Sequence, residues 1–72
     1  MSEYVVIYEQ SPTGWGAYCP DLPGLGVASA TRQEVEQLIN EAISLHIESL
    51  RKHGEPVPPP TSAAGVVTVS AA

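Results

Sequence analysis

The sequence predicts an α+β fold with the element order β-β-β-α-β, in which one helix packs on one face of a small mixed sheet. The first thirty residues hold short runs of β-branched and aromatic residues separated by Pro and Gly. A capping signal then opens one long amphipathic stretch, and a valine-rich run follows a group of prolines. With 72 residues, the chain is expected to form a single domain over residues 1–72.

The first three strands are expected before residue 30. Residues 3–9 (E-Y-V-V-I-Y-E) are apolar at both alternating sets of positions, which predicts a central strand. Residues 11–14 (S-P-T-G) are typical of a turn, so residues 15–19 (W-G-A-Y-C) are expected to return as a hairpin with a loop of about five residues. The prolines and glycine of residues 20–24 stop this ladder, and a short third strand is expected around residues 26–29.

One helix follows. Thr31 and Glu34 form a T-x-x-E capping box, so the helix is expected to begin there. Gly54 is expected to end it as a left-handed C-cap. An apolar arc of roughly 200° on a helical wheel predicts that the helix lies on a sheet. The arc holds Val35, Leu38, Ile39, Ala42, Ile43, Leu45, His46, Ile47 and Leu50.

A proline-rich segment and a last strand complete the predicted order. Residues 55–60 (E-P-V-P-P-P) are expected to run extended, because proline lacks the backbone donor. Residues 65–70 (G-V-V-T-V-S) predict a final strand. A helical crossover makes that strand parallel to a neighbour, most simply the first strand.

The predicted pairing leaves one face of the sheet open. If Glu9 lies opposite Trp15, then Tyr4, Tyr8 and Tyr18 share one face, and small aliphatic residues share the other. A single helix covers one face and packs better on the small residues, so the tyrosine face is expected to be open. The tyrosine face is either the core of an interface or a partly solvated surface, where tyrosine occurs because it favours β-strands. A register shift of one residue would exchange the faces.

Composition limits the classes of partner and compartment. Three Lys+Arg against eight Asp+Glu give a net charge of −5, which opposes direct nucleic-acid binding and favours a basic protein partner. No apolar run approaches the ~20 residues of a membrane span, and the lone Cys19 fits a reducing compartment, so a cytoplasmic protein is expected. A domain this small buries little surface, which favours a homo-oligomer.

No catalytic or metal site is expected. Glu3 and Glu9 lie at opposite ends of one strand, too far apart to share divalent ions. His46 and His53 are separated by about 10.5 Å along the helix axis, so they cannot share one metal. His46 is interpreted as a packing residue, Cys19 as a small core residue, and no cofactor is implied.

Two further residues have alternative interpretations. Asp21 can accept hydrogen bonds from amides of its own turn or offer a carboxylate to a basic partner. Trp15 is either a lid on one edge of the core or an interface anchor. Pro23 and Gly24 are expected to set the geometry of the turn.

The order of these features resembles the HicB-like antitoxin family. The features are W-G-A-Y (15–18), P-D-L-P-G (20–24), E-A-I-S-L-H-I-E-S-L (41–50) and H-G-E-P-V-P-P-P (53–60), followed by the valine-rich run. The resemblance covers nearly the whole chain, from about residue 4 to residue 69.

The resemblance implies a degenerate RNase H-like fold and a non-enzymatic domain that neutralises a small, basic, HicA-type mRNA-cleaving toxin. Many members also carry a C-terminal DNA-binding segment; this chain ends just after the last strand, so a protein-binding domain alone is expected. The alternative is a self-assembling structural or regulatory domain without a toxin partner. The residues expected to contact a partner are Tyr4, Tyr8, Trp15, Tyr18, Asp21 and Leu22.

Overall fold

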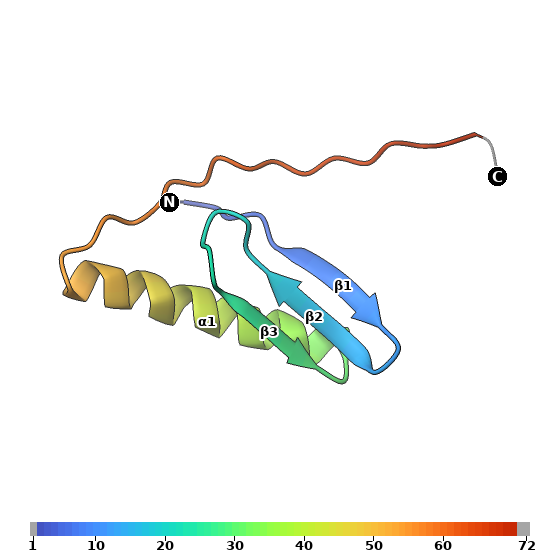
Figure 1. Cartoon of the computed structure of the whole chain (residues 1–72), viewed down its shortest axis with the longest axis horizontal. Coiled ribbons are helices and arrows are strands. Elements are labelled where there is room, and N and C mark those ends of the chain that lie inside the picture. The colour runs from blue at the N-terminus through green and yellow to red at the C-terminus, as the bar shows by residue number, and fades with distance from the viewer. Residues whose placement is uncertain (1, 71–72) are drawn as a thin grey trace.

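The computed structural model describes residues 2–70 and confirms the α+β class. Three antiparallel strands, β1 (Ile7–Ser11), β2 (Gly14–Tyr18) and β3 (Gly26–Ser29), precede one helix, α1 (Arg32–Lys52). The helix lies along one face of the sheet (Figure 1). The strand order is β1-β2-β3, so the expectation that the first strand is central is wrong. The central strand is β2.

The hairpin turn is tighter than predicted, and it shifts the register by one residue. Ser11 pairs with Gly14, so the turn holds two residues instead of about five. The Ser11 hydroxyl donates to the Gly14 carbonyl at 3.2 Å, and Gly14 has φ 153°, which favours glycine. Gln10, rather than Glu9, therefore faces Trp15.

This shift exchanges the two faces of β1. Tyr8 pairs with Ala17 and packs on the helix side, whereas Tyr18 pairs with Ile7 and lies on the open side. Tyr4 lines a cavity beside α1. The prediction of one open face carrying all three tyrosines is therefore wrong, because successive side chains of a strand point to opposite sides.

The D-L-P-G motif of residues 21–24 builds the turn between β2 and β3, as predicted. The Leu22 amide donates to the Cys19 carbonyl at 3.1 Å, and the Leu25 amide donates to the Leu22 carbonyl at 3.3 Å. Gly24 adopts φ 82°, a left-handed conformation that its lack of a Cβ permits. Cys19 is only 2% exposed, which confirms it as a small core residue.

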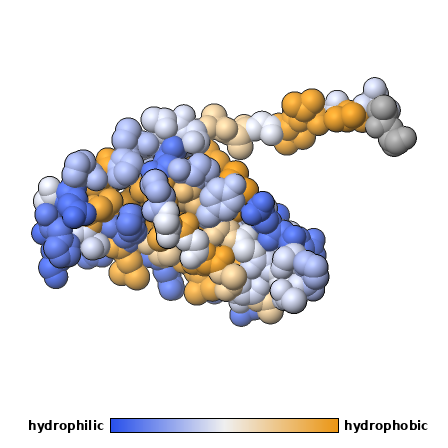
Figure 2. Space-filling model, in the orientation of Figure 1, coloured by the Kyte–Doolittle hydropathy of each residue, from blue (hydrophilic) through white to orange (hydrophobic). Residues whose placement is uncertain are grey.

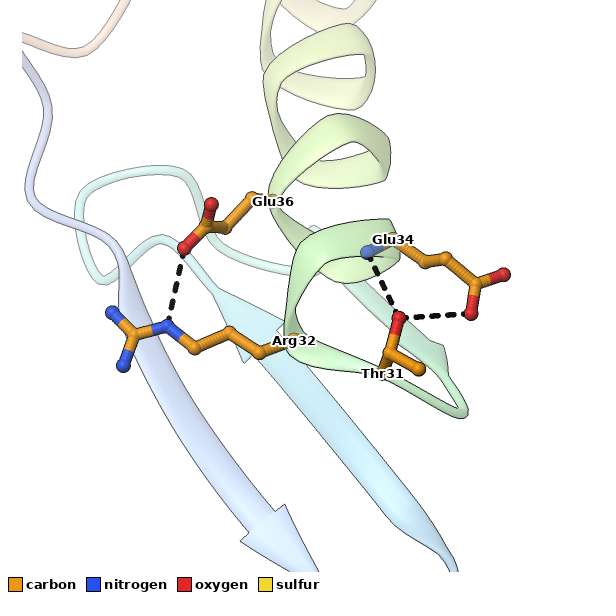
Figure 3. Close-up of polar contacts among 4 residues, drawn as sticks. All are labelled: Thr31, Arg32, Glu34 and Glu36. Carbon is orange, nitrogen blue, oxygen red and sulfur yellow. Dashed lines mark hydrogen bonds and ion pairs between the residues drawn. The ribbon is translucent and has the colours of Figure 1, made fainter.

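The helix begins at the predicted cap. Thr31 is the N-cap, and its hydroxyl oxygen accepts from the Glu34 amide at 3.2 Å (Figure 3). The same hydroxyl donates to the Glu34 carboxylate at 2.9 Å, so this carboxylate contacts the cap side chain rather than a free backbone amide. At the other end Gly54 has φ 68°, which confirms the left-handed position that closes the helix.

The core lies between the first half of α1 and the central strand. Ala17, Val35 and Ile39 are buried, and partly buried residues surround them: Val6, Tyr8, Trp15, Val27 and Ile43. The buried stripe of α1 is narrower than the predicted apolar arc, since Leu38 is 40% exposed and Leu45 is 65% exposed. No helix within residues 2–70 combines the length and hydropathy that a membrane crossing requires.

The segment after α1 departs from the predicted order. Residues 65–70 pair with no strand of the described chain, so the expected final strand beside β1 is not formed. The chain instead passes the N-terminal segment and continues away from the sheet (Figure 1). Its apolar side chains stand clear of the rest of the molecule (Figure 2). The sheet observed in residues 2–70 is therefore antiparallel rather than mixed.

Candidate functional site

An aromatic cluster, defined here as Tyr8, Trp15 and Arg32, forms where the N-terminus of α1 meets the hairpin. The Arg32 guanidinium carbon lies 4.7 Å from the centre of the Tyr8 ring and 5.6 Å from that of Trp15. The Arg32 Nε also donates to the Glu36 carboxylate at 3.1 Å, and Figure 3 shows this side chain reaching from α1 toward the strands. Arginine and large aromatic residues are the types that dominate the energetics of protein interfaces.

The register brings the two rings of this cluster together. Gln10 lies opposite Trp15 and Tyr8 lies opposite Ala17, so Tyr8 and Trp15 are diagonal neighbours on the helix side. Both rings are partly buried against the core, and the guanidinium above them is half exposed. Trp15 therefore packs against one edge of the core and still borders the surface.

Asp21 binds the segment that follows the helix. Its two carboxylate oxygens accept four hydrogen bonds of 2.9–3.0 Å, from the amide and hydroxyl of both Thr61 and Ser62. The Ser62 amide is the main cause that lowers the pKa of the Asp21 carboxyl below 3.8; partial burial opposes this shift, and the Ser62 hydroxyl and both Thr61 donors reinforce it. Four donors fill the acceptor sites of a carboxylate. The predicted donors within its own turn are replaced by residues forty positions away.

Tyr4 provides a second attachment for the same segment. Its hydroxyl donates to the backbone carbonyl of Pro58, 54 residues along the chain. The connector, defined here as residues 55–62, is thus fixed at Tyr4 and at Asp21. Both residues act within the chain in this structure.

The remaining predicted contact residues lie apart from the aromatic cluster. Leu22 is fully buried, so its side chain presents no surface to a partner in this conformation. Tyr18 is 42% exposed on the side of the sheet that α1 does not cover. The small residues Gly16, Gly26 and Ala28 leave this open side flat around it. The predicted contact residues therefore lie at four separate places. Tyr8 and Trp15 are in the aromatic cluster, Tyr4 and Asp21 bind the connector, Leu22 is in the core, and Tyr18 lies on the open face.

Within residues 2–70, no three His, Cys, Asp or Glu side chains converge in a way that could hold a metal ion. The His53 Nδ1 lies 2.8 Å from the Ser49 carbonyl oxygen at the end of α1. This ring nitrogen is therefore engaged in a contact at the helix terminus.

A comparison with protein families shows which family this chain belongs to. The model that describes the HicB-like antitoxin of bacterial toxin–antitoxin systems matches residues 4–70. The chain belongs to the HicB-like antitoxin family. The match includes the D-L-P-G turn, α1 and the connector, so it confirms the resemblance drawn from the sequence.

Two UPF0150 proteins are similar to this HicB-like chain. One, from Synechocystis sp., is 43% identical over 56 residues, which cover 76% of this chain and 71% of the relative. The other, from Thermoplasma acidophilum, is 39% identical over 57 residues, which cover 78% of this chain and 83% of the relative. No solved structure gives a significant match. The names of these relatives state no activity, so the family itself carries the functional inference.

Sequence reasoning missed one member of the aromatic cluster. Arg32 has no role in the predicted site, although it stands immediately after the N-cap and four residues before Glu36. That spacing signals an ion pair along one helix face. Its position over Tyr8 and Trp15 depends on the hairpin register, which the sequence pattern did not settle.

Proposed function

We propose that this HicB-like domain is a non-enzymatic antitoxin that binds and neutralises a small, basic, HicA-type mRNA-cleaving toxin. The observation that carries this proposal is the antitoxin family match over residues 4–70. The charge of the chain supports it, because a net charge of −5 suits a partner whose own substrate is a polyanion.

The acidic residues are placed for long-range attraction. Glu34, Glu41 and Glu48 are exposed along α1, and Glu9 is exposed on the open side of β1. Complementary charge raises the rate at which two proteins meet and selects against partners of like charge. A basic toxin would therefore be drawn to the helix and to the open face of the sheet.

The aromatic cluster is the best candidate for a short-range anchor. Interface hot spots are enriched in Trp, Tyr and Arg, and they need a surface that a partner can reach and desolvate. Trp15 and Arg32 satisfy both conditions at the exposed junction of hairpin and helix. Asp21 and Leu22 satisfy neither, since one is saturated by hydrogen bonds and the other is buried.

Co-expression with a small, Lys/Arg-rich HicA-type toxin, taken from beside the gene of this chain if one is encoded there, tests the proposal. The intact domain should restore growth and co-purify with that protein. Arg32→Ala should weaken the measured affinity at least about tenfold, since a hot-spot truncation costs more than ~1.4 kcal/mol. Arg51→Ala is the matched control, because it removes the same charge from the exposed far end of α1.

Two results would contradict the proposal. The antitoxin role fails if no HicA-type toxin is neutralised by the folded domain. The non-enzymatic role fails if the purified chain cleaves RNA in the presence of Mg²⁺ and EDTA abolishes that cleavage.

A further inference from the structure

The tail, defined here as residues 63–70, is an apolar extended segment without a partner among the described residues. Val66, Val67 and Val69 are 97%, 86% and 76% exposed. The tail contains no charged residue. Extended β-branched segments with unpaired backbone groups are templates for strand addition, and natural proteins rarely leave them uncovered. The tail therefore has the properties of a strand whose sheet lies elsewhere.

The connector fixes the direction in which the tail leaves the domain. Asp21 binds Thr61 and Ser62 through four hydrogen bonds, directly before the tail begins. Pro58 is held by the Tyr4 hydroxyl, and the prolines around it stiffen the backbone. From this anchored base the tail runs outward (Figure 1). In this conformation it cannot return to the β1 edge of its own chain.

A receiving site for such a strand exists at the outer edge of β1. Within residues 2–70 no strand pairs with that edge, and residues 4–6, which precede β1, also lack a strand partner. The helix packs on β2 and β3, so its second half is less covered than its first. A surface cavity of about 790 Å³ lies there, lined by Tyr4, Ile43 and Ile47 among others.

We propose that two copies of this chain exchange their tails, each tail adding as a strand to the outer edge of β1 in the other copy. Strand alternation places Val67 and Val69 on one side of the tail, and Val66, Thr68 and Ser70 on the other. The more apolar side, Val67 and Val69, packs into the cavity over α1. The exchange extends each sheet by one strand and covers the second half of each helix.

The chemistry of the tail selects a second copy as the occupant. A basic partner is recognised by carboxylates, and the tail has none. Two copies that each carry a net charge of −5 repel one another. An uncharged segment is the part of the chain that can cross between them with the smallest electrostatic cost. The edge of β1 is also the place where the crossover predicts the last strand, so the exchange restores that pairing between chains.

Paired charge substitutions in the full chain test the exchange. Light scattering and sedimentation should give the wild type twice the mass of one chain at micromolar concentration. Val67→Asp with Val69→Asp should give the mass of one chain and leave the helical circular dichroism unchanged. The matched control is Thr68→Asp with Ser70→Asp, which adds the same charge to the opposite side of the same segment and should remain dimeric.

Amide hydrogen exchange distinguishes this dimer from any other. In the wild-type dimer the amides of residues 66–69 should exchange more slowly than in the V67D/V69D chain, because strand pairing protects them. A wild type that stays monomeric overturns the proposal. So does a dimer whose tail amides exchange at the rate of a free peptide, or a dimer that both pairs of substitutions weaken equally.

Discussion

Replacing Tyr8 and Tyr18 separately by serine tests the register of the hairpin, because the two rings lie on opposite sides of the sheet. Tyr8 packs on the core beside Ala17 and beneath Arg32. Burying about 150 Å² of its ring contributes roughly 3–4 kcal/mol at about 25 cal/mol/Å². The compactness of the unfolded chain reduces this value, and the contact with Arg32 adds about 0.5–1 kcal/mol. We expect Tyr8→Ser to lower the free energy of unfolding by about 3 kcal/mol.

Tyr18→Ser is the matched substitution on the open side. Tyr18 is 42% exposed and lies away from α1, so its loss removes mainly strand propensity and cross-strand contact. That loss is about 1 kcal/mol. The difference of about 2 kcal/mol corresponds to roughly 10 °C in Tm for a domain of this size.

Urea denaturation of the full chain measures both losses. Far-UV circular dichroism reports α1, and the fluorescence of Trp15, the single tryptophan, reports the hairpin. All proteins are compared at one concentration, since dimer formation would make stability depend on it. Equal losses, or a larger loss for Tyr18→Ser, would refute the observed register and support pairing of Glu9 with Trp15.

Three more substitutions or conditions have defined outcomes. Thr31→Ala removes the N-cap acceptor of the Glu34 amide and should lower the free energy of unfolding by about 1 kcal/mol in urea titrations; no change would mean that the cap is satisfied by water. Gly14→Ala should cost about 1–3 kcal/mol by the same assay, because φ 153° is strained for alanine and the added Cβ would meet the Ser29 carbonyl oxygen. Asp21 has a lowered pKa in the folded chain, so the stability it contributes is complete above pH 3.8 and is lost as the pH falls through the folded pKa. The amide NMR signals of Thr61 and Ser62 should shift over that acidic range, whereas in Asp21→Asn they should not titrate there.

Local signals in the sequence predicted the elements that short-range chemistry determines. Thr31 and Glu34 placed the helix start because a hydroxyl three residues before an amide satisfies an orphan donor. Gly24 and Gly54 marked left-handed positions, and both adopt positive φ. The third strand begins and ends where it was expected. In each case the determining contact spans only a few residues.

The faces of the sheet were not predictable in the same way. Register depends on the length of one turn, and Pro12-Thr13 lacks the Asn-Gly type of signal that marks a two-residue hairpin. A single residue of slip moved Tyr8 from the expected open face to the core. The aromatic cluster was missed for the same reason, since Arg32 reaches Tyr8 and Trp15 only in the observed register.

The D-L-P-G motif was expected to act mainly as a turn, and the structure gives its residues three separate roles. Gly24 supplies the left-handed backbone, Leu22 fills the core with its side chain fully buried, and Asp21 binds the connector. The third role depends on Thr61 and Ser62, forty residues away, so no local pattern could reveal it. Because the hydrogen bonds of Asp21 to Thr61 and Ser62 fix the direction in which the tail leaves the domain, Asp21→Asn should also change that direction. If the tails are exchanged between copies, a residue inside a tight turn thereby controls the assembly of the protein without contacting the second copy.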